Sequence, residues 1–212
     1  MNILKSIIMI RNKRVVRSLM SKMTLLGDKY EITSQTKVIL SYGSSKDNIV
    51  LHNNVSLLGC HIISQRTGHI ELGNFVKIGS GSKLLAVDSI TIDDYTAIAT
   101  DVTIVDNNNH PINPDFRRFM RTTEHHSDAR SWVHSEHKPI YIGKNCWIGS
   151  DVRIQKGVTI GDNSVIAACS VVTKDVPANC IAAGNPAKIV KTDIDKIPAP
   201  ETCIEFNSLN NK

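Results

Sequence analysis

The most regular feature of the chain is a six-residue repeat of apolar positions between residues 142 and 176. Each repeat carries a large aliphatic residue and, four positions later, a small or β-branched one. The first set is Ile142, Ile148, Ile154, Ile160, Ile166 and Val172, and the second is Cys146, Val152, Val158, Ser164, Ser170 and Val176. A period of six fits neither an α-helix, which repeats every ~3.6 residues, nor an ordinary series of hairpins. It is typical of short parallel strands joined by tight turns, with three hexads in each coil.

The same period continues upstream in less regular form. It occurs at Leu72, Ile78 and Leu84, slips by two residues, resumes at Ile92, Ile98 and Ile104, and is weakest at Leu51, Leu57 and Ile63. We expect one aliphatic side chain per hexad to point into a narrow core. Such a core leaves little room for rings, which agrees with an aromatic content of only 5%. A β-sandwich of short strands would not keep a fixed six-residue register.

Two segments interrupt or precede the repeat and define the domain organisation. Residues 1–35 are predicted to form a basic N-terminal helix, reaching about Leu26, and a polar connector over 27–35. The repeat domain spans 36–191, and residues 106–138 leave it as a long polar excursion before the pattern returns at Ile140. Residues 192–212 form a C-terminal tail without periodicity. Loops as long as this excursion are usually functional or disordered.

The charge of the chain is unevenly distributed. The net charge is +5, but residues 1–27 carry six basic residues and no acidic one, so the other 185 residues carry −1. A nucleic-acid groove across the domain is therefore disfavoured. Anionic lipid attracts basic, partly apolar segments, so the basic leader could contact an anionic membrane at its cytoplasmic face. The alternative is a helix that packs on the end of the repeat domain or on a neighbouring subunit.

Composition predicts a soluble protein of the cytoplasm. Hydrophobic content is 41% and charged content 21%, and no stretch approaches the ~20 apolar residues needed to span a bilayer. The five cysteines form no C-x-x-C pair and are odd in number, which favours reduced thiols, several of them in small core positions.

Four features in a fixed order resemble one family. They are the hexads, His110-Pro111 within the excursion, Cys146-Trp147-Ile148-Gly149, and Ala183-Gly184-Asn185-Pro186-Ala187-Lys188. Together, over about residues 70–191, they resemble the hexapeptide-repeat acyltransferases, nearest the galactoside/maltose O-acetyltransferases and the bacterial polysaccharide O-acetyltransferases. The resemblance implies a mainly β fold, a left-handed parallel β-helix. It also implies a homotrimer with active sites between neighbouring subunits, and acetyl-CoA as acetyl donor.

The resemblance assigns His110 as the general base. An alcohol is a weak nucleophile at neutral pH, and a neutral imidazole is well suited to take its proton. Asp106, four residues earlier, could orient the base, and Asp88 approximately matches a family aspartate that contacts the acceptor sugar. Both aspartates could instead serve only as turn formers. Arg117 could hold an anionic sugar or simply face water.

The resemblance also assigns a path for the donor. It puts Trp147 beside the active-site cleft and the backbone N–H of Ser150 at the thioester carbonyl, where it would stabilise an oxyanion. Lysine ammonium groups suit the phosphates of CoA. The remaining matched positions along the pantetheine, adenine and nucleotide are Ala168, Thr173, Lys174, Asn185, Pro186, Lys188 and Lys191.

The excursion is also rich in histidine, at 125, 126, 134 and 137, with Asp128 nearby. This spacing matches no common zinc signature, so no metal is expected. These side chains are expected to cover the acceptor cleft or to pack on a neighbouring subunit. The function predicted first is transfer of acetyl to a sugar hydroxyl of a surface polysaccharide or its precursor. The alternatives are N-acetylation of an amino sugar nucleotide and a non-catalytic trimeric scaffold.

Overall fold

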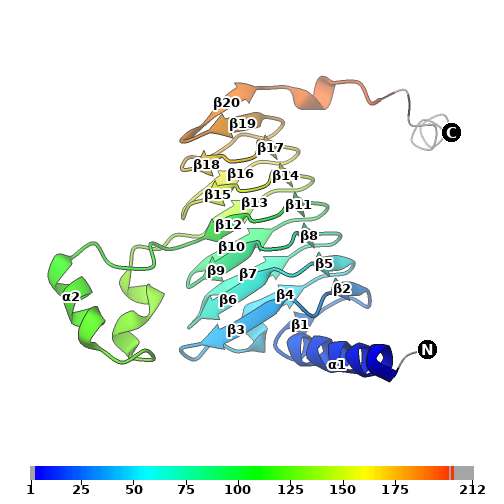
Figure 1. The fold of residues 1–212 in the computed structure, drawn as a ribbon. Coiled ribbons are helices and arrows are strands. Elements are labelled where there is room, and N and C mark those ends of the chain that lie inside the picture. The colour runs from blue at the N-terminus through cyan, green and yellow to red at the C-terminus, as the bar shows by residue number, and fades with distance from the viewer. Residues whose placement is uncertain (1–2, 201, 203–212) are drawn as a thin grey trace.

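A computed structural model describes residues 3–200 and 202 of the chain, with side chains from residue 12 onward. Most of these residues form a three-sided prism of short strands, one coil stacked on the next (Figure 1). Helix α1 (Ile3–Met20) lies across one end of the prism, and the excursion with helix α2 (Pro114–Thr122) projects from its side. Residues 203–212 of the predicted tail, with Cys203, lie outside the described residues.

Each coil contributes one strand to each of three sheets, which we call A, B and C. Sheet A contains β1 (Thr24–Leu25), β4 (Ile49–Leu51), β7 (His69–Leu72), β10 (Ser89–Ile92), β13 (Ile140–Ile142) and β16 (Thr159–Ile160). Sheet B contains β2 (Tyr30–Ile32), β5 (Val55–Leu57), β8 (Lys77–Ile78), β11 (Ala97–Ile98), β14 (Trp147–Ile148), β17 (Val165–Ile166), β19 (Ile181–Gly184) and β20 (Ala187–Lys191). Sheet C contains β3 (Lys37–Ser41), β6 (His61–Gln65), β9 (Lys83–Ala86), β12 (Thr103–Val105), β15 (Arg153–Ile154) and β18 (Val171–Val172).

Neighbouring strands in each sheet run parallel, except that β19 and β20 form an antiparallel hairpin at the far end. This arrangement confirms the β-helix predicted from the hexads, and three parallel sheets are consistent with the left-handed form.

The core is a stack of aliphatic side chains in register. Within sheet C, for example, Ile154 lies between Ile104 and Val172, and all three are buried. The second member of each hexad also points inward, since Val152 and Val158 are buried as well. Each hexad therefore supplies two inward side chains, where the sequence analysis expected one. In β6 the inward aliphatic residue is Ile62, whereas the hexad count had selected Ile63, which is only half-buried.

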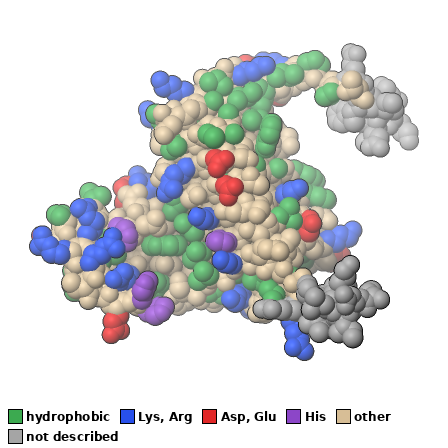
Figure 2. Space-filling model, in the orientation of Figure 1, with side chains coloured by type: hydrophobic (Ala, Val, Ile, Leu, Met, Phe, Trp, Pro, Cys, Tyr) green, Lys and Arg blue, Asp and Glu red, His purple; other side chains and the backbone are tan. Residues whose placement is uncertain are grey.

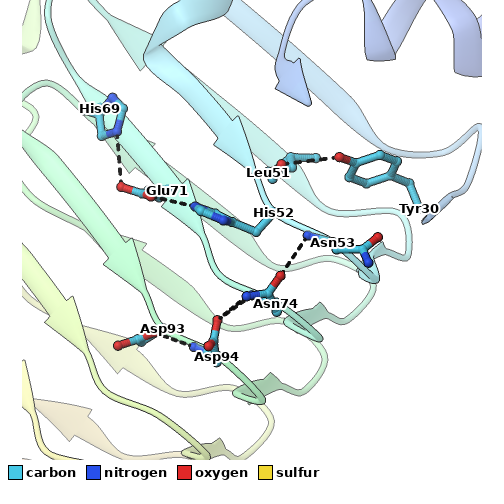
Figure 3. A network of polar contacts seen from close by, with 9 residues as sticks. All are labelled: Tyr30, Leu51, His52, Asn53, His69, Glu71, Asn74, Asp93 and Asp94. Atoms are coloured by element: carbon cyan, nitrogen blue, oxygen red, sulfur yellow. Dashed lines mark hydrogen bonds and ion pairs between the residues drawn. The ribbon is translucent and has the colours of Figure 1, made fainter. Parts of the chain in front are cut away.

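Side chains reinforce the turns between sheets A and B. The Asn74 Oδ1 atom accepts a hydrogen bond from the backbone N–H of Asn53 at 3.1 Å. Asp94 Oδ1 in turn accepts from the Asn74 N–H at 2.6 Å (Figure 3). Beside this ladder, on the outer face of sheet A, Glu71 contacts both His52 (2.8 Å) and His69 (3.7 Å). Each turn is thus held to the next coil by a polar side chain, which keeps the coils in register.

The N-terminal helix is shorter than predicted. It ends at Met20, not near Leu26, because the chain must turn at 21–23 to bring Thr24 beside Val50 in sheet A. The expected connector over 27–35 contains β2, so the first coil begins before residue 36. Leu19 and Met23 are buried in the core, so the end of α1 closes the prism as the packing interpretation predicted. None of the described helices is long and apolar enough to cross a membrane.

The described thiols are not paired. Cys60, Cys146 and Cys180 are buried in the core, as predicted for small core positions, and Cys169 is exposed. Burial raises the pKa of Cys60 to about 12, so its thiolate is essentially absent at neutral pH. Burial likewise raises the pKa of Cys146. These two buried thiols are therefore poor nucleophiles.

Candidate active site

The excursion leaves the prism at the corner between sheets C and A, after β12, and returns at β13 (Figure 1). Its outgoing and returning segments form a two-stranded neck. Asn107 and His137 pair there in antiparallel fashion, and the N–H of Asn108 donates to the carbonyl of Glu136 at 3.0 Å. The N–H of Lys138 donates to the carbonyl of Asp106 at 2.9 Å. This neck fixes the point from which His110 projects.

Asp106 anchors the neck to the coil below. Its carboxylate accepts hydrogen bonds from the backbone N–H groups of Val87 (3.1 Å) and Asp88 (2.8 Å) and from Asn107 Nδ2 (2.9 Å). Burial raises the pKa of Asp106, and the hydrogen bonds oppose that effect. The residue is fully buried, so it has no surface through which to contact an acceptor. Its carboxylate fixes the position of the neck and makes no hydrogen bond to His110.

Asp88 makes the second contact across the neck. Its Oδ2 atom lies 3.0 Å from His137 Nδ1, and each side chain is about one-third exposed. The sequence analysis assigned Asp88 to the acceptor and left His137 with the other excursion histidines, so it missed this pair. The two residues are 49 positions apart, and no local pattern links them. The contact ties the returning segment of the excursion to the turn between β9 and β10.

The outer part of the excursion has its own structure. Helix α2 begins at an Asn113 cap, whose Oδ1 accepts from the N–H of Phe116 at 2.8 Å, with Pro114 in the first turn. The sequence analysis did not predict this helix.

The returning half of the excursion is attached to sheet C. Arg66 forms an ion pair with Asp128, and Gln65 Oε1 accepts from the Trp132 N–H at 2.9 Å. Asp128 also contacts His134 Nε2 at 3.2 Å. Among the described residues, no group of three or more His, Cys, Asp or Glu side chains lies close enough to hold a metal ion. The excursion is therefore a folded lobe fixed at two places, and not an extended loop.

His110 is exposed on this lobe, three residues beyond the neck. It borders a small cavity lined by His110, Arg117, Met120, Arg121 and Arg130. Arg117 is held there because its Nη1 donates to the carbonyl of Ile112 at 2.6 Å. The structure thus brings the predicted base and Arg117 to one cavity. Asp106 lies in the neck, and Asp88 lies in the turn between β9 and β10 that contacts the neck.

A second group of predicted residues lies at a different corner, between sheets B and C. Ser150 and Ala168 occupy equivalent turn positions in successive coils, joined by the hydrogen bond from the Cys169 N–H to the Ser150 carbonyl at 2.9 Å. The N–H groups of Ser150 and Ala168 donate to no acceptor in the part of the chain that the structure describes. Gly149 is needed here, because a Cβ atom would lie 2.6 Å from the Ala168 nitrogen. Trp147, on the adjoining strand β14, is 60% exposed.

The remaining residues predicted to bind the donor lie at these two corners or on β20. Asn185 and Pro186 form the turn between β19 and β20, which is held over the B–C corner by the Gly184 N–H donating to Ser170 Oγ at 3.1 Å. Lys188 and Lys191 are exposed along β20. Thr173 and Lys174 follow β18, so they lie at the C–A corner, from which the excursion also leaves. The prism face formed by sheet C therefore separates the His110 group from the Ser150 group within one chain.

Comparison with known proteins identifies the family. A sequence model of the bacterial transferase hexapeptide (six repeats) matches residues 139–174. The crystal structure of the polySia-specific acetyltransferase NeuO is 32% identical with a TM-score of 0.64, over 87% of this chain and 72% of that protein. The chain belongs to the hexapeptide-repeat acetyltransferases.

Three further relatives are acetyltransferases as well. The galactoside O-acetyltransferase of Escherichia coli (strain K12) is 42% identical over 108 residues, which is 51% of this chain and 46% of that protein. A galactoside acetyltransferase structure in complex with coenzyme A is 31% identical with a TM-score of 0.54, over 82% of this chain and 66% of that one. A putative acetyltransferase of Staphylococcus aureus (strain COL) is 51% identical over 61 residues, 29% of this chain and 31% of that protein. The matched segments thus span less than half the length of the Escherichia coli and Staphylococcus aureus proteins.

Proposed function

We propose that the protein is an O-acetyltransferase that moves acetyl from acetyl-CoA to a sugar hydroxyl of a surface polysaccharide or its precursor. The observation that carries this proposal is the placement of His110. An exposed imidazole stands on a lobe that two anchors hold rigidly, beside a cavity able to take part of an acceptor. The likeness to sugar and polysialic acid acetyltransferases supports the same acceptor class.

The chain offers suitable contacts for acetyl-CoA at the B–C corner. The pantetheine arm is an extended chain with two amide groups, and the unpartnered N–H of Ala168 offers a hydrogen-bond donor to it. The unpartnered N–H of Ser150, one coil away, remains free for the thioester carbonyl. The small side chain of Ala168 leaves the corner open. The exposed ammonium groups of Lys188 and Lys191 suit the phosphates at the other end of CoA.

The reaction follows from these placements. His110 accepts the proton of the acceptor hydroxyl as the oxygen attacks the thioester carbonyl. The tetrahedral intermediate carries its negative charge on the former carbonyl oxygen, and the N–H of Ser150 donates to that oxygen. Collapse of the intermediate breaks the C–S bond, and the departing thiolate takes the proton back from His110. The products are an acetyl ester and free CoA.

The assembly we propose is a homotrimer with one active site between each pair of neighbours. Within one chain, sheet C separates His110 from Ser150, so a complete site requires a second copy. The C–A corner of one subunit can face the B–C corner of the next, a head-to-tail contact that closes into a ring. Thr173 and Lys174 would then line the cleft from the same side as His110.

An acetyl-transfer assay with product analysis tests the proposed function. We expect CoA thiol release that depends on a glycan and yields an ester, which mild alkali hydrolyses. An alkali-stable amide on an amino sugar would instead assign the N-acetyltransferase alternative. CoA binding without transfer to any neutral, acidic or amino-sugar glycan would favour the scaffold. A reaction without acceptor measures the background hydrolysis of acetyl-CoA.

We also propose that residues 1–27 bring the enzyme to an anionic membrane surface. While the end of α1 packs on the prism, Lys13, Arg14 and Arg17 stay exposed. Each basic residue near such a surface contributes about 1 kcal/mol. In flotation with anionic vesicles we expect the full chain to float at low salt and not at high salt. Neutral vesicles and a version with Lys13, Arg14 and Arg17 changed to glutamine are the controls, and full-length protein that never floats contradicts the proposal.

A further inference from the structure

The cavity beside His110 is lined by three guanidinium groups, those of Arg117, Arg121 and Arg130. In the described part of the chain, no carboxylate lies within ion-pair distance of any of the three. Four of the five acidic residues of the excursion are engaged elsewhere: Asp115 with Arg118, Asp128 with Arg66 and His134, Glu136 with Lys156, and Asp106 with the neck. The fifth, Glu124, is exposed and forms no ion pair with the described residues. No ion pair among the described residues therefore compensates the positive charge of the cavity.

Two of the three arginines are held in place by hydrogen bonds to backbone carbonyls, yet they keep free hydrogen-bond donors. Arg117 donates from Nη1 to the Ile112 carbonyl, and Arg130 donates from Nε and Nη2 to the Thr123 carbonyl at 3.3 and 2.9 Å. A guanidinium has five N–H donors, so each retains others. Figure 2 shows Lys and Arg side chains gathered on the projecting lobe, together with histidine side chains.

Repulsion between the arginine side chains destabilises helix α2 in the free protein. Arg117 and Arg121 are four residues apart on α2, so they share one face of the helix. Like charges at this spacing destabilise a helix. An anion bound between them would offset that repulsion. Because guanidinium groups form paired hydrogen bonds with carboxylate and phosphate oxygens, the cavity suits an oxyanion.

We infer that this cavity binds an oxyanion, a carboxylate or phosphate, on the sugar that is acetylated. The inference rests on the proposed function, since it is the nearness of His110 that assigns the anion to the acceptor. The bound group fixes the sugar so that a hydroxyl close to it reaches the imidazole. The enzyme thus selects acidic sugars over neutral ones.

Binding measurements with matched sugars test this inference. Galactose, galacturonic acid and galactose 6-phosphate share one ring and differ at C6, and a sialic acid oligomer supplies carboxylates on a polymer. By calorimetry on the assembled protein without CoA, we expect at least one anionic ligand to bind about tenfold more tightly than galactose. The carboxylate and phosphate ligands distinguish the two sources of the oxyanion. Equal or weaker binding of every anionic ligand overturns the inference.

Matched variants locate the site. Arg121→Gln is expected to remove the preference for anionic ligands and to raise the acceptor KM about tenfold, with the acetyl-CoA KM unchanged. Arg118→Gln, on the same helix but paired with Asp115, is expected to keep the preference. If Arg121→Gln raises the acetyl-CoA KM instead, the cavity binds a phosphate of CoA and the inference is wrong. Anion binding that persists with no acetyl transfer to any sugar would reject the proposed function and retain the anion site.

Discussion

Replacing His110 with alanine is expected to lower kcat for acetyl transfer by about 10²–10⁴-fold, the usual contribution of a general base. Acetyl-CoA binding is expected to change little, because the N–H donors assigned to CoA lie at the opposite edge of sheet C. Steady-state kinetics of thiol release and calorimetry with CoA measure the two quantities. His125→Ala is a matched control, since His125 is exposed on the same lobe and does not line the cavity.

A second imidazole makes this experiment more discriminating. A carboxylate often orients a histidine base, and His137 has such a partner, because Asp88 Oδ2 lies 3.0 Å from its Nδ1. Among the described residues, no side chain forms a hydrogen bond with the His110 imidazole. Because His137 holds the neck, we expect His137→Ala to cost less kcat than His110→Ala and to lower thermal stability. A larger loss of kcat for His137→Ala, with the fold intact, would transfer the role of base to His137.

The prism could be predicted from the sequence because its geometry is local. Each strand has only a few residues and each turn is tight, so the inward positions recur every six residues and appear directly in the chain. The second inward position was underestimated because Val152 and Val158 are followed in the same set by Ser164 and Ser170, and serine is common in turns. All four are buried.

The site was less predictable because its contacts are not local. His110 and Arg117 lie close in sequence and do border one cavity. The roles of Asp106 and Asp88 depend on backbone N–H groups and a histidine that lie 18 to 49 residues away, and no periodicity reports such contacts. Arg130 joins the cavity only because the returning half of the excursion folds back on α2. In the proposed trimer the two corners meet between subunits, so a single chain shows each half of the proposed site by itself.

Introducing aspartate in place of Ile154 is expected to prevent folding. Ile154 is fully buried between Ile104 and Val172, and within the prism no cation lies among the core side chains to pair with a new carboxylate. An unpaired buried charge costs several kcal/mol, which is comparable with the ~5–15 kcal/mol that stabilises a typical domain. We expect loss of the β-sheet circular dichroism signal and of a soluble oligomer on size exclusion.

Two companion variants separate the core effect from a general effect of charge at this strand. Arg153→Asp changes the exposed neighbour on β15, and we expect it to fold as the wild type does. Ile154→Ala leaves a cavity without a charge, so it is expected to fold with a loss of about 2–5 kcal/mol, measured by denaturant unfolding. Because every coil stacks on the next, the disruption caused by Ile154→Asp should extend to Cys146 and Cys180. Their thiols would then react with maleimide in buffer without denaturant. Wild-type stability of the aspartate variant would mean that this position does not face the core and that the hexad register is wrong.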